Sequence, residues 1–312
     1  MRTCGILMPV SSLPGPYGIG SLGAAAYQFV DFLKESSQSY WQILPIGPTG
    51  YGDSPYQSFS AFSGNPYFID LDTLKEQNLL TEQECDTARY PEGENIDYRW
   101  LFDTRFSLLR KAVGRMNRQD EDFKYFCADN VAWLEDYALF MALKSENLHV
   151  AWQDWPDELR LRDETALKQA RLRLGEDIHF WQAVQYLFFK QWFALKSYAN
   201  QNGIQIIGDI PIYVSPDSSE IWANSQLFQV NQDKRQTLMA GCPPDAFSAD
   251  GQLWGNPLYN WEYHAKTDFA WWVERLRTSQ HIYDITRIDH FRGFAGYFAI
   301  PAEDKTAVNG HW

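Results

Sequence analysis

The feature that most constrains the fold is the alternation of short apolar runs with longer amphipathic segments. The runs have the length of β-strands and cover residues 5–10, 41–46, 204–210 and 282–289. Apolar residues at helical spacing in 22–32 separate the first two runs, and a strand–helix–strand order favours a parallel pair joined by a crossover. The alternation therefore predicts a parallel α/β sheet, either open or closed into a barrel.

Two long excursions interrupt this alternation. We expect a largely helical insertion at about residues 50–170, with its clearest helix at 125–144, and then an aromatic-rich helix at 178–201. Residues 216–260 are rich in Gly, Pro, Asn and Trp, which is typical of an active-site loop insertion, and a helix at 268–278 precedes the last strand. Both excursions follow the carboxyl ends of predicted strands, where a (β/α)₈ barrel places its active-site loops.

Charge and composition exclude several classes of partner. Acidic residues outnumber basic ones by 40 to 27, so the chain would repel phosphate backbones and anionic lipids, and we expect neither nucleic acid nor membrane partners. The four cysteines lack metal-ligand spacing, so no metal is expected. No apolar run forms a signal peptide or reaches the roughly 18 residues that span a bilayer, so we expect a cytoplasmic location.

The tripeptide Arg287-Ile288-Asp289 carries the clearest candidate chemistry. Residues two apart on a strand share a face, so the guanidinium and the carboxylate lie side by side. A neighbouring cation keeps a carboxylate ionised, and an ionised carboxylate at a strand end suits a nucleophile that attacks a sugar. A structural ion pair is the alternative, but the polar residues at 290–293 favour a site.

Two further segments are predicted to end at the same edge of the sheet. Asp209 closes the third strand and lies level with Asp289 if the two strands are parallel neighbours; alternatively, it caps the following turn. Trp254 lies between two glycines in residues 251–257, which we expect to form a loop. This tryptophan is either a platform for a substrate or an anchor that holds the loop to the core.

Five motifs, in this order, resemble the amylomaltase (4-α-glucanotransferase, glycoside hydrolase family 77) family, and the resemblance runs over nearly the whole chain. They are residues 53–62, 208–212, 243–247, 251–257 and 287–293. The resemblance implies a (β/α)₈ TIM barrel with helical insertions, of which this chain holds only about the first four strands. It also implies retaining transfer of α-1,4-glucan segments, with maltooligosaccharides, maltodextrins or starch-derived glucans as partners and without metal or cofactor.

The resemblance also implies roles for individual residues. Asp289 is similar to the nucleophile that forms the glycosyl-enzyme, and Arg287 to its charge partner. The remaining matched positions are similar to contacts with sugar rings, and they are Tyr56, Asp209, Trp254 and His290.

One part of the family's pattern is missing. The family's general acid/base is a Glu after the next barrel strand, and after Asp289 this chain has only the acids Glu303 and Asp304, in a segment that matches the connection before that strand. We therefore expect a C-terminally truncated fragment that is inactive and poorly soluble alone. A hydrolase with the same barrel and a non-catalytic glucan-binding fragment are the alternatives.

Overall fold

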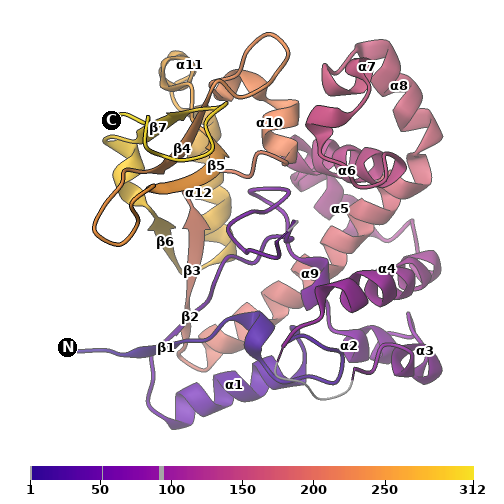
Figure 1. Ribbon diagram of the computed structural model, residues 1–312. Helices are drawn as coiled ribbons and strands as arrows, with labels where there is room; N and C mark the ends of the chain where they lie inside the picture. Colours follow the sequence, from indigo (N-terminus) through magenta and orange to yellow (C-terminus); the bar gives the residue numbers. More distant parts are fainter. Residues whose placement is uncertain (1, 51, 91–94) are drawn as a thin grey trace.

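A four-stranded parallel sheet with the order β1-β2-β3-β6 forms the centre of the molecule (Figure 1). The computed structural model describes residues 2–50, 52–90 and 95–312, so positions 51 and 91–94 of the expected insertion lie outside the description. The strands of the sheet are Gly5–Leu7, Tyr40–Gln42, Gln205–Pro211 and Ile285–Asp289. The alternation thus correctly predicted an α/β fold. Strands β1 and β6 are the two edges, so the sheet does not close within the described residues.

Three of the four strands are shorter than the apolar runs predicted. Strand β1 ends at Leu7, because Pro9 has no amide hydrogen for a ladder and the next residues form a 3₁₀ turn at Val10–Ser12. Strand β6 begins only at Ile285, because Ile282 is the last residue of the preceding helix. Apolar character alone does not distinguish the end of a buried helix from the start of a buried strand.

Three helices pack against this sheet. They are α1 (Ala24–Glu35), α9 (Gly175–Gln201) and α12 (Ala270–Ile282), which contact β2, β3 and β6 respectively. Val30 and Leu33 on the inner face of α1 have no exposed surface. One part of the core therefore lies between the sheet and these helices, and the same cluster continues into the helical insertion.

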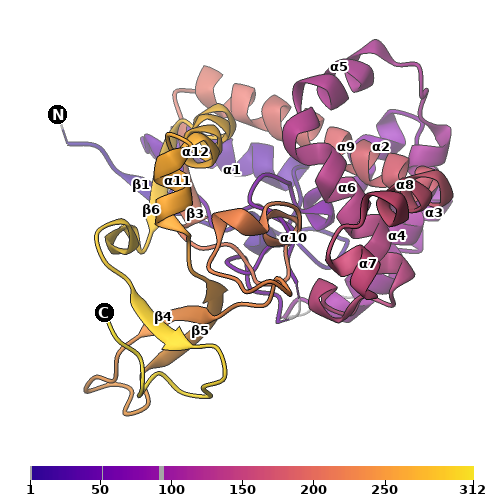
Figure 2. The same ribbon diagram turned by 90° about the horizontal axis from the view of Figure 1, so that it is seen from above.

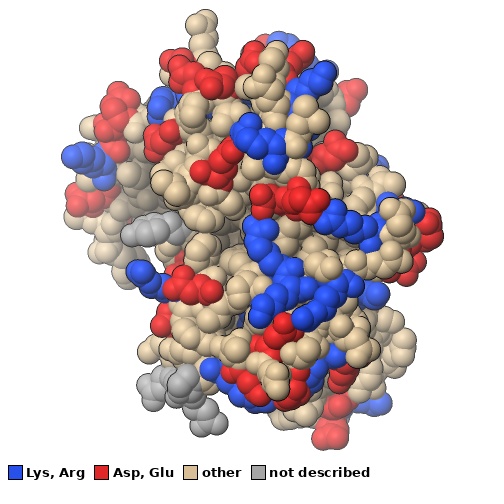
Figure 3. Space-filling model, turned by 90° about the vertical axis from the view of Figure 1, so that its right-hand side faces the viewer, with Lys and Arg blue, Asp and Glu red and all other residues tan. Residues whose placement is uncertain are grey.

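Besides α9, seven α-helices lie between β2 and β3 in the described part of the chain, to the right of the sheet in Figure 1. On the helical side of the molecule, basic side chains gather in a band near the centre of the view, and acidic side chains border it (Figure 3). Ion pairs such as Arg110–Asp177 and Arg173–Glu146 link neighbouring helices there. The helices are α2 (Leu71–Glu76), α3 (Glu82–Asp86), α4 (Tyr98–Arg115), α5 (Glu121–Asp129), α6 (Val131–Glu146), α7 (Asp157–Arg160) and α8 (Glu164–Arg173).

The single helix predicted at residues 125–144 is wrong, because Asn130 divides it into α5 and α6. The side chain of Asn130 donates to Phe126 O at 2.9 Å and accepts from the indole N–H of Trp133 at 3.0 Å. A short amide side chain that bonds to its own neighbourhood competes with the helical ladder, which explains the break.

A second sheet was not predicted. Strands β4 (Leu238–Cys242), β5 (Gln252–Pro257) and β7 (Phe298–Pro301) form an antiparallel sheet with the order β5-β4-β7. Figures 1 and 2 show it beyond the carboxyl ends of β3 and β6. The expected loop at 251–257 is therefore largely a strand, and the region 216–260 also contains the short helix α10 (Ser219–Ala223).

In the described ranges, no helix combines the length and the apolar composition that crossing a bilayer requires.

Candidate active site

Arg287 joins two carboxylates at the carboxyl ends of β3 and β6. Its Nη1 donates to both oxygens of Asp209 at 2.7 Å, and its Nη2 donates to Oδ1 of Asp289 at 2.6 Å. Arg287 and Asp289 therefore share a face of β6, as the two-residue period of a strand predicts. The hydrogen bond to Asp209, assisted by that to Asp289, raises the pKa of Arg287 above its usual value.

The register of the two strands differs from the expectation. Strands β3 and β6 are parallel neighbours, but Asp209 pairs with Arg287, and Pro211 pairs with Asp289. Asp209 thus lies two residues below Asp289 rather than level with it. The offset places the guanidinium, rather than the second carboxylate, directly beside Asp209.

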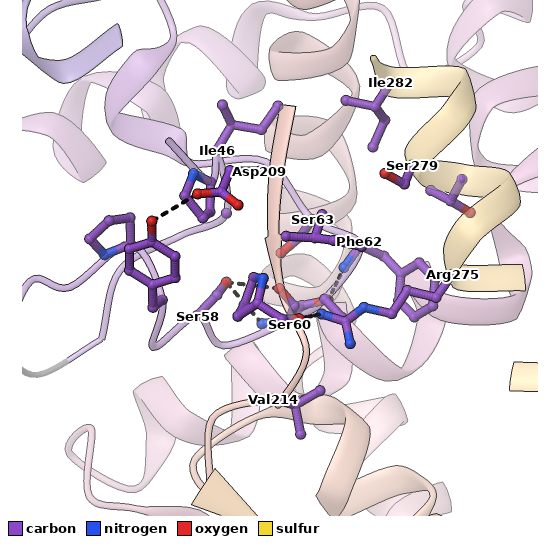
Figure 4. Close-up of a pocket in the computed structure, with 18 of the residues that line it drawn as sticks. Ile46, Ser58, Ser60, Phe62, Ser63, Asp209, Val214, Arg275, Ser279 and Ile282 are labelled. Atoms are coloured by element: carbon purple, nitrogen blue, oxygen red, sulfur yellow. Dashed lines mark hydrogen bonds between the residues drawn. The ribbon is translucent and has the colours of Figure 1, made fainter. Parts of the chain in front are cut away.

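Asp209 is the buried member of this group, with 1% of its side chain exposed against 40% for Asp289. The phenol of Tyr56 donates a second contact to Asp209, at 2.8 Å from Oδ2. Figure 4 shows Asp209 beside the end of β3, facing a small cavity. Burial and the bond to Asp209 raise the pKa of Tyr56 to about 12, so its proton stays on the phenol at neutral pH.

A cavity of about 340 Å³ opens beside the carboxylates. Its lining comes from the loop after β2, the end of β3, strand β5 and the end of β6. The sequence motifs had named four of the lining residues, which are Tyr56, Trp254, Asp289 and His290. Asp209 and Arg287 contact this group through hydrogen bonds, so all six predicted residues lie in one neighbourhood.

His290 and Trp254 form one wall of this cavity. His290 follows β6 with a left-handed backbone (φ 53°), which turns its ring back toward the strand end. The rings of His290 and Trp254 meet edge to face, with centroids 4.9 Å apart. Burial lowers the pKa of His290, so the imidazole is neutral at neutral pH and can both donate and accept hydrogen bonds.

Sequence reasoning missed three lining residues with polar side-chain groups, which are Gln57, Tyr213 and Asn256. The amide of Gln57 donates to Oδ1 of Asn256 at 3.3 Å, and this contact joins the loop after β2 to β5. Gln57 and Asn256 belong to motifs that were noticed for their tyrosine and tryptophan instead. Adjacent amides in those motifs were the available signal, since such groups orient the hydroxyls of a ligand.

The cavity presents aromatic faces, amides, a neutral imidazole and the Asp289 side chain paired with Arg287. This combination can bind a neutral polyhydroxyl ring and place its reactive carbon at the carboxylate. Within the described ranges, no group of three or more His, Cys, Asp or Glu side chains is arranged to hold a metal ion.

A family model described as 4-alpha-glucanotransferase matches residues 8–312. The chain belongs to the 4-alpha-glucanotransferase family. This finding confirms the resemblance that the five motifs indicated. The glucanotransferases of Clostridium butyricum and Thermus thermophilus are 51% and 47% identical to this chain, over 98% and 100% of its length.

Solved structures agree with this assignment. An amylomaltase from Streptococcus agalactiae in complex with acarbose matches all of this chain with a TM-score of 0.97 and 45% identity. An amylomaltase from Corynebacterium glutamicum shares the fold, with a TM-score of 0.80 at 19% identity. The chain covers 63% and 62% of the two glucanotransferase sequences and 64% of the Streptococcus agalactiae chain.

Proposed function

We propose that this chain carries the nucleophile of a 4-α-glucanotransferase, which transfers segments of α-1,4-glucans to an acceptor sugar. The donors would be maltooligosaccharides, maltodextrins or starch-derived glucans. The observation that carries the proposal is the cavity in which Arg287 holds Asp289 beside Trp254 and His290. Family membership and the acarbose complex of a related amylomaltase support the same substrate class.

The reaction is a double displacement that retains the anomeric configuration. In the first step a carboxylate oxygen of Asp289 attacks the anomeric carbon, the glycosidic bond breaks, and the leaving oxygen takes a proton from an acid. In the second step a hydroxyl of the acceptor sugar attacks the same carbon, gives its proton back to that acid/base group, and releases Asp289. Two inversions at one carbon restore the α configuration.

Each side chain in the proposal has a defined part. Arg287 pairs with Asp289 and orients it, while Asp209 and His290 bind hydroxyls of the transferred sugar. Tyr56 and Trp254 contact rings on the donor or acceptor side, since aromatic faces pack against the C–H faces of sugars. Transfer is preferred over hydrolysis if an acceptor sugar held by these rings occupies the place from which water would attack the anomeric carbon.

The proton donor is not evident in this cavity. A retaining mechanism needs a second carboxyl group about 5 Å from the nucleophile. Among the described residues that line the cavity, Asp289 is the single acid, and Asp209 is already engaged by Arg287 and Tyr56. We therefore propose that another segment supplies the acid/base group and that this chain alone does not turn over natural glucans.

The architecture has a matching interpretation. We propose that the parallel sheet represents about the first four strands of a (β/α)₈ barrel. The helices within 50–170 and the segment 216–260 are then insertions at the carboxyl ends of its strands. This placement agrees with the position of active-site loops in such barrels.

An activated donor tests the nucleophile without the missing acid. Fluoride leaves without a proton, so α-maltotriosyl fluoride should glycosylate Asp289 in this chain. Intact mass spectrometry should show one added maltotriosyl group, and peptide mapping should place it on Asp289. The Asp289→Asn variant should remain unmodified. An equal adduct on Asp289→Asn, or no adduct on a wild-type chain that binds maltohexaose, would refute the proposed nucleophile.

Natural donors test the remaining claims. Incubation with maltotriose should yield neither glucose nor longer oligosaccharides if the acid lies outside this chain. Longer oligosaccharides that disappear in Asp289→Asn would establish transfer and disprove the missing acid. Glucose and maltose without longer products would identify a hydrolase.

A further inference from the structure

The segment that follows Tyr56 is anchored by a buried acid that the proposed reaction does not use. Glu220 lies on α10, the short helix reached after β3 ends. Its Oε1 accepts a hydrogen bond from the hydroxyl of Ser60 at 2.8 Å and another from the backbone N–H of Ala61 at 3.0 Å. One carboxylate oxygen thus holds two consecutive residues of the loop after β2.

Further hydrogen bonds hold residues 58–62 against α10 and against one another. The backbone N–H of Ser219, next to Glu220, donates to Phe59 O at 2.9 Å. The hydroxyl of Ser58 donates to Ser60 O at 2.8 Å, and the Ser60 hydroxyl also accepts from the N–H of Phe62 at 3.1 Å. Figure 4 shows Ser58, Ser60 and Phe62 along one wall of the small cavity that Asp209 also faces. Residues 58–62 therefore form a tight turn attached to α10.

A buried carboxyl group at position 220 is unfavourable for the stability of the fold. Glu220 is 4% exposed, and its Oε2 has no hydrogen-bond partner among the described residues. Burial raises the pKa of Glu220, with the bonds from Ser60 and Ala61 acting in the opposite direction. Apolar residues of similar volume often stabilise such positions as well or better. The geometry is better explained by the need to fix residues 58–62 in one conformation.

That conformation determines where Tyr56 lies. Tyr56 is two residues before Ser58, and its phenol reaches Asp209 at 2.8 Å. The loop after β2 is therefore bound to β3 at Asp209, and to α10 at Glu220 and at the neighbouring Ser219. If the Glu220 contact is lost, Ser60 and Ala61 lose the two hydrogen bonds that fix them, and the backbone bond from Ser219 to Phe59 O remains as the attachment of this segment to α10.

We propose that Glu220 is a positioning residue that fixes residues 58–62 and thereby aligns Tyr56 with Asp209. The importance of this alignment for sugar binding rests on the proposed function, but the alignment itself does not. Glu220 acts through the loop and does not line the candidate active-site cavity.

A fluorine label on Tyr56 reports the alignment directly. We would incorporate 3-fluorotyrosine at position 56 of the full chain and record its ¹⁹F resonance. Asp209→Asn provides the reference for an altered phenol contact. Glu220→Ala should move the resonance toward that reference. Glu220→Gln should leave it in place, because its carbonyl oxygen can accept the same two hydrogen bonds.

A matched control separates positioning from general destabilisation. Asp70 is another buried carboxylate, which accepts from the Thr73 N–H and hydroxyl at 2.8 Å and from the Ser21 hydroxyl at 2.7 Å. Asp70→Ala removes comparable bonds elsewhere in the molecule, so the resonance of Tyr56 should stay at its wild-type position. A shift as large as that of Glu220→Ala would overturn the proposal.

The remaining outcomes are also decisive. A folded Glu220→Ala variant with the wild-type resonance would overturn the proposal. If that variant does not fold, Ser60→Ala takes its place, with a partial shift expected and no shift overturning the proposal. Maltohexaose affinity should fall about tenfold in Glu220→Ala, as expected for the loss of one strong contact. If the wild type does not bind maltohexaose, the proposed function fails while the fluorine result still decides the role of Glu220.

Discussion

Arg287 forms one ion pair with Asp209 and another with Asp289, and a comparison of the two tests how burial sets the strength of an ion pair. The Asp209 side chain is 1% exposed, whereas those of Asp289 and Arg287 are 40% and 45% exposed. Arg287→Met removes both contacts and keeps a similar volume. Removing the partner of a fully buried charge costs about 3–5 kcal/mol. Because Arg287 is partly hydrated and Tyr56 keeps one bond to Asp209, we expect the Arg287–Asp209 ion pair to contribute about 2 kcal/mol to the free energy of unfolding.

Double-mutant cycles separate the contributions of the two ion pairs. One cycle pairs Arg287→Met with Asp209→Asn, and the other pairs it with Asp289→Asn. We expect a coupling energy of about 2 kcal/mol in the first cycle and below about 1 kcal/mol in the second, because exposed pairs are weak. Equilibrium urea unfolding, followed by fluorescence of the 13 tryptophans, would supply the free energies of unfolding.

The sign of each coupling is as informative as its size. Arg287→Met leaves Asp209 as a buried anion, whereas the double variant with Asp209→Asn leaves no buried charge, so the double variant should be less destabilised than the sum of the two single variants. Coupling energies that are equal for Asp209 and Asp289, or larger for Asp289, would refute the argument from burial. The partly exposed guanidinium would then act equally on both carboxylates.

Two further predictions concern glycine sites and pH. A Cβ on Gly208 would lie 2.1 Å from the ring of Tyr283, so Gly208→Ala should destabilise the chain by about 1–3 kcal/mol. A Cβ on Gly114 meets no heavy atom within 4 Å, so Gly114→Ala in α4 should stabilise it by about 0.4–1 kcal/mol, and urea midpoints that shift in the same direction would contradict this contrast. Because burial raises the pKa of Glu220 above 4.5, the folded state holds its proton more tightly, and wild-type stability falls as pH rises through that raised pKa. Glu220→Gln should therefore gain stability relative to the wild type as pH rises above 4.5, and a pH-independent difference in unfolding midpoints would disprove the raised pKa.

The sequence predicted the parallel sheet and the strand-end carboxylates well, because both depend on local periodicity. The predicted third strand at 204–210 matches β3 within one residue at each end. The shared face of Arg287 and Asp289 follows from the two-residue period alone. The pairing of Asp209 with Arg287 did not follow, since the register between β3 and β6 depends on contacts between segments about 80 residues apart.

The antiparallel sheet could not be predicted from local patterns. Strands β4 and β5 contain glycines and a terminal proline, which are typical of loops, and they are stabilised by pairing with each other. Gly241 illustrates the reason for the unusual composition. A Cβ at this position would lie 2.2 Å from Gln252 O, so the residue that weakens the strand signal is the one that allows the two strands to approach. The same pairing holds Trp254 at the cavity.

The site therefore combines two scaffolds. Asp209, Arg287 and Asp289 lie on the parallel sheet, and buried Arg275 on α12 fixes the end of β3 by donating to the carbonyl oxygens of Pro211 and Ile212. Trp254 instead lies on the antiparallel sheet. Because the carboxylates do not depend on β4 or β5 for any described hydrogen bond, substitutions in those strands can reshape the sugar-binding wall while the nucleophile and its cation stay in place. On the proposed function, differences in glucan preference should therefore arise mainly from the antiparallel sheet.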